Sequence, residues 1–285
     1  IGASALSTED TGFYNTAIGF EALKDYNYDG EGSNVAVGYL AAAELTTGNH
    51  CVAIGSSALG THTTGHSNIA IGSGAMKNTD AGSTSLNSTH NVFMGYNAGG
   101  GTWTDVASNQ NVAIGNYAMD SPLDGALNNT SIGYGSLSGI TTGDNNTVVG
   151  HNAGNAITTG NNNTALGYNA AGAIIDGTYN VAVGRNSGDA LTDGGSNTFI
   201  GTNTGSASTS LNDAVLIGRD AGVNGNMTSA ANGTIGIGRD ALMALTSGQD
   251  NTAVGYQALK VNVVGDENTA IGYQALVACA GGDAE

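Results

Sequence analysis

The sequence is poor in proline, cysteine and charge, and each shortage excludes a class of protein. A single Pro among 285 residues, without Gly at every third position, excludes a collagen-like triple helix. The two cysteines, Cys51 and Cys279, are too few for a disulfide framework. No apolar run approaches the ~20 residues of a membrane-spanning helix, so we predict no membrane insertion.

The scarcity of basic residues excludes another class. Only 10% of the residues are charged, and six Lys and Arg face 23 Asp and Glu, for a formal net charge of -17. Such a chain repels the phosphates of nucleic acids and anionic membrane surfaces, so we predict no nucleic-acid partner. The 40% of apolar residues suffice for a core only if they are regularly placed.

Their placement is regular because one motif, N-[TV]-A-[IV]-G, recurs along the whole chain. We call its Gly position 0 and number the other residues of each repeat from it. Sixteen glycines occupy position 0, and ten of their 15 spacings are 17 residues. This short period without a helical pattern predicts an all-β parallel β-solenoid (β-roll or β-helix) of about 16 coils, a single repeat domain over residues 1–285. The position 0 glycines are Gly2, Gly19, Gly38, Gly55, Gly72, Gly95, Gly115, Gly133, Gly150, Gly167, Gly184, Gly201, Gly218, Gly238, Gly255 and Gly272.

The residues around position 0 predict two strands in each coil. Position −1 is aliphatic or Met, as in Ile18, and position −3 is β-branched, as in Thr16, with usually Ala between them. Because side chains alternate across a strand, positions −3 and −1 share a face, which we expect to line the coil interior. A second strand should follow, as in residues 255–259. Its small residue at position +3 predicts close approach of a neighbouring layer or chain, and position +4 should close the core.

Two further positions predict the corners of the coil. Position −4 is Asn in 12 of 15 complete repeats, which predicts a stacked amide ladder and a left-handed corner. Position −7 is Gly in nine of the ten regular repeats, often within T-T-G. Every insertion replaces this tight corner, so the inserted loops should project from one edge. The insertions span residues 24–33, 77–90, 100–110, 120–128 and 223–233.

The motif resembles two families of fibrous proteins. Residues 34–38 and 111–115 are similar to the head repeats of YadA-type trimeric autotransporter adhesins, and residues 163–170 and 251–259 to repeats of bacteriophage tail-fibre proteins. The resemblance covers essentially the whole chain and implies a left-handed, trimeric solenoid. The adhesin repeat is shorter than the one found here.

Candidate chemical groups are few. Carboxylates such as Asp220 and Asp240 occupy position +2, which is Asn in other repeats, and this pattern predicts an exposed ladder. His62 and His66 have no second pair of ligands for a tetrahedral metal site, and the G-G-x-G-x-D motif of calcium-binding β-rolls is absent. Clustered carboxylates for glycan cleavage are also missing. We therefore predict no cofactor, no metal and no enzymatic activity.

The longest insertions are the candidate contact loops, because a rigid scaffold commonly presents binding residues on loops. Trp103 could stack against a carbohydrate, or its indole could fold back over the coil edge. The candidate contact residues are Lys77, Asp80, Thr102, Trp103 and Asp105.

These features together favour a structural role. The leading hypothesis is the shaft of a viral (phage) tail fibre or similar surface fibre that supports attachment to a host cell. The alternative is a bacterial trimeric surface adhesin that binds glycan or matrix protein through its edge loops. We expect a homotrimer, because Gly and the small residue at +3 would let chains approach, and a location in the virion tail fibre or at the cell surface. Neither end carries a polar cap, so we expect a fragment of a longer fibre that contacts adjoining segments and, as a further candidate partner, a cell-surface receptor.

Overall fold

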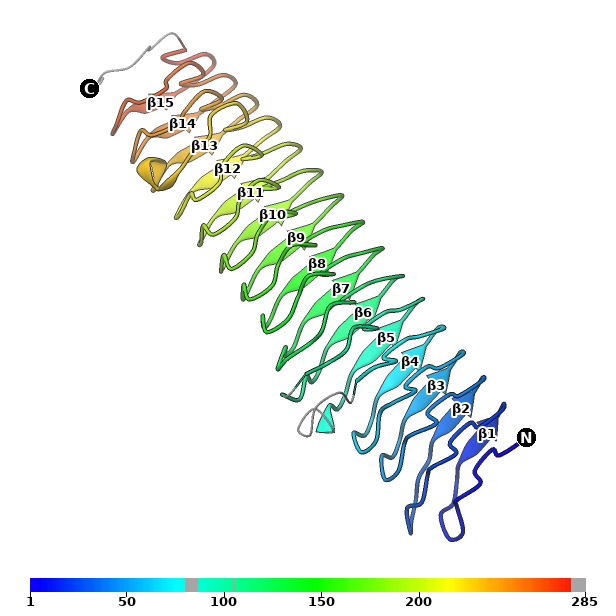
Figure 1. Cartoon of the computed structure of the whole chain (residues 1–285). Coiled ribbons are helices and arrows are strands. Elements are labelled where there is room, and N and C mark those ends of the chain that lie inside the picture. Colours follow the sequence, from blue (N-terminus) through cyan, green and yellow to red (C-terminus); the bar gives the residue numbers. More distant parts are fainter. Residues whose placement is uncertain (80–86, 105, 278–285) are drawn as a thin grey trace. The chain divides into compact units, whose positions relative to one another are not determined.

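A computed structural model describes residues 1–79, 87–104 and 106–277, and its contacts divide the chain into two compact units, Ile1–Asn145 and Asn146–Glu285 (Figure 1). Each unit is a stack of coils with one three-residue strand per coil. In the first unit the strands are β1 (Thr16–Ile18), β2 (Val35–Val37), β3 (Val52–Ile54), β4 (Ile69–Ile71), β5 (Val92–Met94), β6 (Val112–Ile114) and β7 (Thr130–Ile132). In the second they are β8 (Thr147–Val149), β9 (Thr164–Leu166), β10 (Val181–Val183), β11 (Thr198–Ile200), β12 (Val215–Ile217), β13 (Ile235–Ile237), β14 (Thr252–Val254) and β15 (Thr269–Ile271), with a 3-10 turn, η2 (Ser229–Ala231), between β12 and β13.

The predicted parallel β-solenoid is confirmed, with about 15 turns and a repeat of about 17 residues. Neighbouring strands within each unit pair in parallel, so that equivalent positions of successive repeats stack on one another. In the second unit, Ala165, Ala182 and Phe199 follow one another in register. No strand precedes Gly2, before which the sequence has only Ile1. None of the described segments is a helix of the length and hydrophobicity that a membrane span requires.

The predicted second strand is wrong, because the chain after position 0 forms successive turns instead. Positions +2 and +4 have left-handed backbone, as in Asn169 and Ala171, both with φ of 53°. The Asn186 amide donates to the Tyr168 carbonyl of the preceding coil at 2.9 Å, whereas the Ala171 amide donates to the Ser187 carbonyl of the following coil at 2.9 Å. Alternating left-handed residues explain the frequency of Asn and Asp at position +2.

The prediction that the β-branched face lines the interior is also wrong. In every strand the middle residue, at position −2, is buried, and the residues at −3 and −1 are exposed or half-buried, as in β9 and β10. The alternation across the strand is as predicted, but its direction is reversed. The physical reason is that the coil is thin. Only one layer of side chains separates the strand from the turns of its own repeat, so the usually small residue at position −2 faces inward and the larger residues at −3 and −1 face outward.

Positions −2 and +4 fill this layer by matching a large residue with a small one. Phe93 at −2 lies against Gly99 at +4, and Phe199 lies against Gly205. In several coils with Ala at position −2, such as Ala113, position +4 is large and fully buried, as in Met119, but three coils have small residues at both positions. The expectation that position +4 closes the core is therefore confirmed.

The predicted Asn ladder at position −4 is confirmed. The Asn180 side-chain amide and backbone amide both donate to Oδ1 of Asn163, at 3.1 and 3.0 Å, and Nδ2 of Asn180 also donates to the Gly194 carbonyl of the next corner at 2.8 Å. These buried amides satisfy backbone groups that no strand pairs. The left-handed residue at this corner is the one before the ladder, such as Asn162 with φ of 58°, rather than the ladder Asn itself.

Candidate interaction surface

The strands carry two columns of side chains on their outward face, at positions −3 and −1, which we call the outer columns. Position −3 is Val, Ile or Thr. Position −1 is aliphatic or Met throughout, and Leu166 remains 48% exposed, with Ile200 38% exposed, in the second unit. In the first unit Ile18 and Ile114 are 42% and 39% exposed. Parallel strands with apolar residues on both faces are typical of sheets that are covered on both faces. Within each unit, the chain covers only the inner face.

The small residues at position +3 do not form part of this outer surface. Ala22, Ser136 and Thr204 are fully buried inside their coils. Gly184 at position 0 has φ of 131°, and a Cβ there would collide with the Gly201 carbonyl of the next coil. Glycine and the small residue therefore serve the stacking of coils within one chain, which removes the argument from them for a trimer.

Position +1 forms a third exposed column, which runs beside the outer columns. Its rings stack along the second unit: His151 on Tyr168 at 5.5 Å between centroids, and Tyr256 on Tyr273 at 5.3 Å. The Arg185 guanidinium lies 5.9 Å from the Tyr168 ring centroid. Tyr168 is 52% exposed, so this column faces the solvent.

The predicted polar ladder at position +2 lies next to it and is less exposed than expected. Asn203 donates to Asp220 at 3.0 Å, and Gln257 donates to Asp240 at 3.2 Å. Arg219 pairs with Asp220 at 3.2 Å within the same repeat. Asp240 is only 7% exposed. These carboxylates are held by a ladder of amides and a neighbouring cation, as a structural element would be.

The insertion loops contain the contact residues that the sequence suggested. Lys77 and Thr102 are exposed. Asp80 and Asp105 lie outside the described residues. For Lys77 and Thr102 a role in contacts stays a prediction.

Trp103 lies in the core and not on the surface, where a contact residue would lie. Its side chain is completely buried, its Nε1 donates to the Gly99 carbonyl at 3.1 Å, and its ring lies 5.7 Å from that of Phe93. The alternative in which the indole folds back over the coil edge is therefore the one observed. A buried indole cannot stack against a sugar, so Trp103 is corrected from the contact surface to the core.

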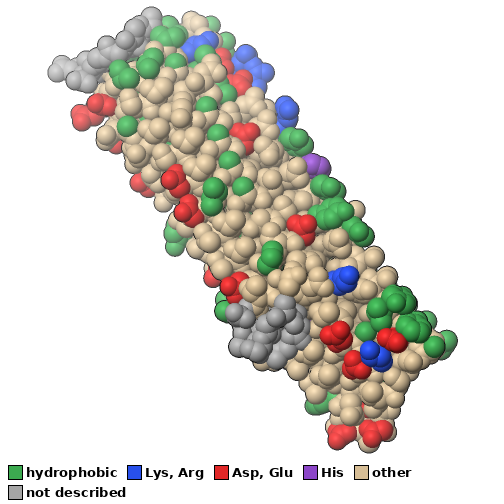
Figure 2. Space-filling model, in the orientation of Figure 1, with side chains coloured by type: hydrophobic (Ala, Val, Ile, Leu, Met, Phe, Trp, Pro, Cys, Tyr) green, Lys and Arg blue, Asp and Glu red, His purple; other side chains and the backbone are tan. Residues whose placement is uncertain are grey.

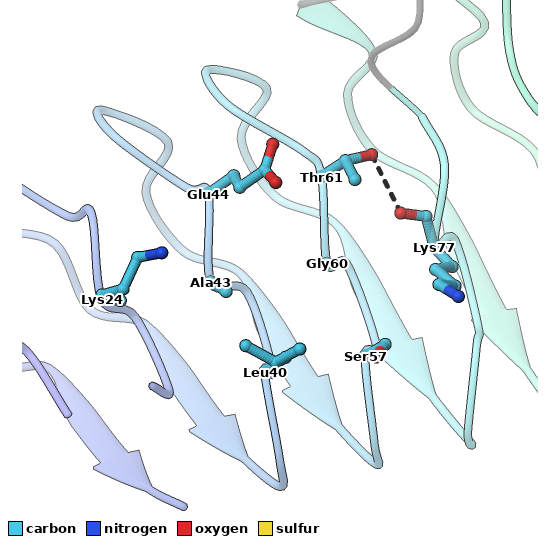
Figure 3. Close-up of a pocket in the computed structure, with 8 residues that line it drawn as sticks. All are labelled: Lys24, Leu40, Ala43, Glu44, Ser57, Gly60, Thr61 and Lys77. Atoms are coloured by element: carbon cyan, nitrogen blue, oxygen red, sulfur yellow. Dashed lines mark hydrogen bonds between the residues drawn. The ribbon is translucent and has the colours of Figure 1, made fainter. Parts of the chain in front are cut away.

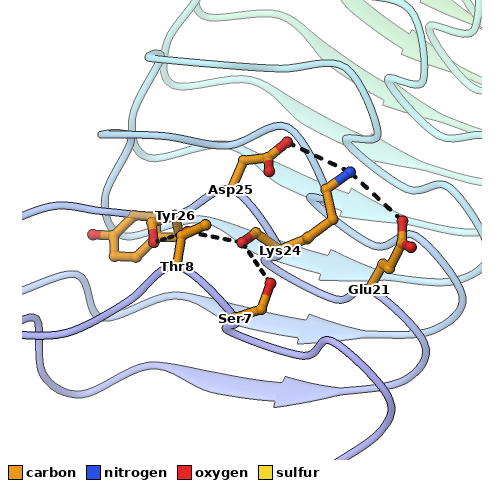
Figure 4. Close-up of polar contacts among 6 residues, drawn as sticks. All are labelled: Ser7, Thr8, Glu21, Lys24, Asp25 and Tyr26. Atoms are coloured by element: carbon orange, nitrogen blue, oxygen red, sulfur yellow. Dashed lines mark hydrogen bonds and ion pairs between the residues drawn. The ribbon is translucent and has the colours of Figure 1, made fainter.

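A shallow hollow of about 130 Å³ lies beside Lys24 and Lys77 in the first unit (Figure 3). Its other lining groups include the Glu44 carboxylate and the exposed edge of Leu40. The Lys24 ammonium already lies 3.6 Å from Glu21 and 3.7 Å from Asp25 (Figure 4). The hollow is smaller than the ~300 Å³ at which small-molecule sites begin, and its charges are balanced.

The histidines do not form a metal centre within the described part of the chain. No three His, Cys, Asp or Glu side chains there come together in an arrangement that could hold an ion. His62 is fully buried, and its ring nitrogens lie 2.9 Å from Thr79 Oγ1 and 3.1 Å from Asn68 Nδ2. Burial lowers the pKa of His62 to about 4, which keeps the ring neutral. His62 is thus a polar core residue, which a sequence without contact information could not distinguish from a ligand.

No protein-family model matches the chain, and no curated protein matches it in sequence. The outer columns and the column at position +1 are therefore the features from which a function has to be argued.

Proposed function

We propose that this protein is a structural fibre segment whose solenoid assembles with other copies of itself through the outer columns. The assembly that fits the repeat is a parallel, left-handed homotrimer. Its place would be the shaft of a phage tail fibre or a similar surface fibre that supports attachment to a host cell. The observation that carries the proposal is the apolar outer face of the strands in each unit.

The exposed apolar side chains of the outer face favour burial against another protein surface. Val183 and Ile200 lie opposite each other on adjacent strands at position −1, a column that contains only aliphatic residues and Met, whereas position −3 beside it carries Thr198 as well as Val. A contiguous apolar surface of this kind marks an interaction site in a soluble protein. A second copy of the chain offers the same straight, periodic surface, and its spacing of ~4.8 Å per coil matches by construction.

An ice-binding role is disfavoured by the outer columns themselves. Thr130, Thr147 and Thr164 succeed one another at position −3 and are not buried. Position −1 is never Thr, however, so the paired Thr columns of a T-x-T array are not formed. The expectation that the Thr residues at position −3 lie in the coil interior is therefore wrong. The missing second Thr column still argues against ice binding.

The test of assembly is a pair of substitutions on the outer face of neighbouring strands. Val183→Asp with Ile200→Asp places two charges on the outer columns, and should convert an oligomer to a single chain while the far-UV circular dichroism stays unchanged. Thr142→Asp with Thr159→Asp, at the exposed position −8 where later coils carry Asp176 and Asp193, adds the same number of carboxylates and serves as the matched control, with no loss of association expected. An outer-column variant that remains oligomeric would overturn the proposal.

The second candidate, a bacterial surface adhesin, is favoured by the exposure of Lys77 and Thr102 in adjacent insertions. Lys77→Ala with Thr102→Ala removes both exposed groups and should leave the fold intact under either hypothesis, because neither side chain is buried. Attachment to cells then separates the two. Unchanged attachment assigns the protein to a shaft, whereas loss of attachment with an unchanged oligomer assigns the binding to the loops.

A further inference from the structure

The two edges of the outer face carry opposite charges. Position −5 lies just before the strand and position +1 just after it. All three arginines of the chain, Arg185, Arg219 and Arg239, occupy position +1, and no acidic residue does. Asp213, Asp250 and Glu267 occupy position −5, which never carries Lys or Arg. In the upper part of Figure 2, which holds the second unit, blue side chains gather along the right-hand edge, and red ones without blue neighbours lie along the left-hand edge.

The two positions also match in kind within single repeats. In three consecutive coils of the second unit, position −5 and position +1 are an aromatic ring and a cation, two hydroxyls, and an acid and a base. Five of the six side chains are exposed, and the sixth, at position +1 of the hydroxyl pair, is half-buried. The pairs are Tyr179 with Arg185, Ser196 with Thr202, and Asp213 with Arg219.

These partners cannot meet within one chain. They are six residues apart across an extended strand, which separates them by roughly 15–20 Å. The Asp213 carboxylate has no ion-pair partner among the described residues. The side chains at −5 and +1 can therefore pair only between two copies. The −5 edge of one copy must lie against the +1 edge of the other, with equivalent coils side by side.

We propose that the protein self-associates by a head-to-tail contact in which the −5 edge of each chain meets the +1 edge of its neighbour, parallel and in register. Arg219 then pairs with Asp213 of the neighbouring copy, and Arg185 lies over the Tyr179 ring of that copy. Arg239, whose own coil has Gly233 at position −5, lies between the levels of Asp213 and Asp250. This inference rests on the proposed self-association and adds the geometry of its contact.

A head-to-tail contact has a symmetry that can be tested. Different patches meet in it, so it closes into a ring of three or more chains, whereas a two-fold contact joins only two. A one-coil slip would place Arg219 opposite Ser196 or Gly233 and Arg185 opposite Asn162 or Ser196. It would lose both the Arg219–Asp213 and the Arg185–Tyr179 pairs and form only one acid–base pair, between Arg239 and Asp213 or Asp250. The unlike charges of the two edges thus select the parallel direction, and the Arg185–Tyr179 pair together with the Arg219–Asp213 pair favours the in-register alignment.

The experiment uses disulfide trapping in the full chain with Cys279→Ser as background. Cys51 can remain, because it is buried and its thiol pKa is raised to about 11 by burial. Asp213→Cys combined with Arg219→Cys should give, on mild oxidation, a covalent product of three chains. Each cysteine variant alone should give none, because positions 213 and 219 face each other and not themselves.

The outcomes separate this inference from the proposed function. Sedimentation of the unoxidised double variant reports whether the chains associate at all. An oligomer that gives no covalent product, or only a covalent pair, overturns the head-to-tail contact while self-association stands. A single chain that is also found for the wild type overturns both.

Charge reversal provides an independent test that needs no new thiol. Asp213→Arg should weaken association at least tenfold (~1.4 kcal/mol), because it places two cations opposite each other. Adding Arg219→Asp should restore association to within about threefold, because the pair is re-formed with exchanged signs. No rescue by the second substitution would contradict the pairing.

Discussion

The inner and outer faces of the strands are both apolar, yet they differ in how their side chains are chosen. On the inner face the size of each residue depends on its own coil, so that Phe93 accompanies Gly99 and Ala113 accompanies Met119. On the outer face position −1 stays aliphatic or Met in every coil without such a partner. Packing within the chain therefore explains the residue sizes on the inner face. It does not explain why position −1 on the outer face stays aliphatic or Met.

The largest expected effect contrasts neighbouring residues on the two faces. Phe199→Ala empties the space beside Gly188 and Gly205 and should lower the free energy of unfolding by about 3–5 kcal/mol at every protein concentration. For Ile200→Ala, the loss of unfolding free energy should rise with protein concentration, because the Ile200 side chain becomes buried only on assembly. Chemical unfolding followed by circular dichroism at two concentrations measures both. Equal concentration dependence for the two variants would contradict the comparison.

The next effect tests a polar group of the interior. The His62 pKa is lowered from 6.5 to about 4 by burial, so the unfolded chain binds a proton that the folded chain does not as the pH falls through this window. Stability conferred by the neutral ring is complete above about pH 6.5 and is lost towards pH 4, by about 3 kcal/mol. The difference in unfolding free energy between wild type and His62→Gln should follow this curve. A difference independent of pH would refute it.

A smaller effect concerns the amide ladder that borders the inner face. Asn180→Ala removes the donor to the Gly194 carbonyl and the acceptor of two hydrogen bonds from Asn197, and should cost about 2–3 kcal/mol. Asn180→Thr is the matched variant, because Thr234 occupies the same position and donates to the Gly248 carbonyl at 3.3 Å. Thr should retain part of the lost stability. Thermal unfolding of the three proteins ranks them, and equal losses would argue against the ladder.

The period, the strand before position 0 and the Asn ladder could be predicted from the sequence, because each depends on local spacing, whereas the predicted second strand was wrong. The side of the strand that faces inward could not be predicted from alternation, which defines two faces without assigning them. β-branched residues such as Val181 suggest a core by their chemistry, but the thin coil accommodates Ala182 instead. The reciprocal sizes at positions −2 and +4 carried the missing signal.

The candidate site was predictable only in part. Exposure of Lys77 follows from its place in an insertion, whereas burial of Trp103 depends on Gly99 and Phe93, which leave room for the indole beneath the inserted loop. The outer columns were recognised as apolar but assigned to the wrong side. Consequently the expected trimer was argued from small residues such as Ala22, which are buried inside the coil.

The central claim is that the outer columns are covered by further copies of this chain. Sedimentation equilibrium of the unmodified protein over a wide range of concentrations tests it most directly. The account predicts a mass three times that of one chain, which persists on dilution until the apolar contact dissociates. A single-chain mass at every concentration, with a β-rich circular dichroism spectrum, would contradict it.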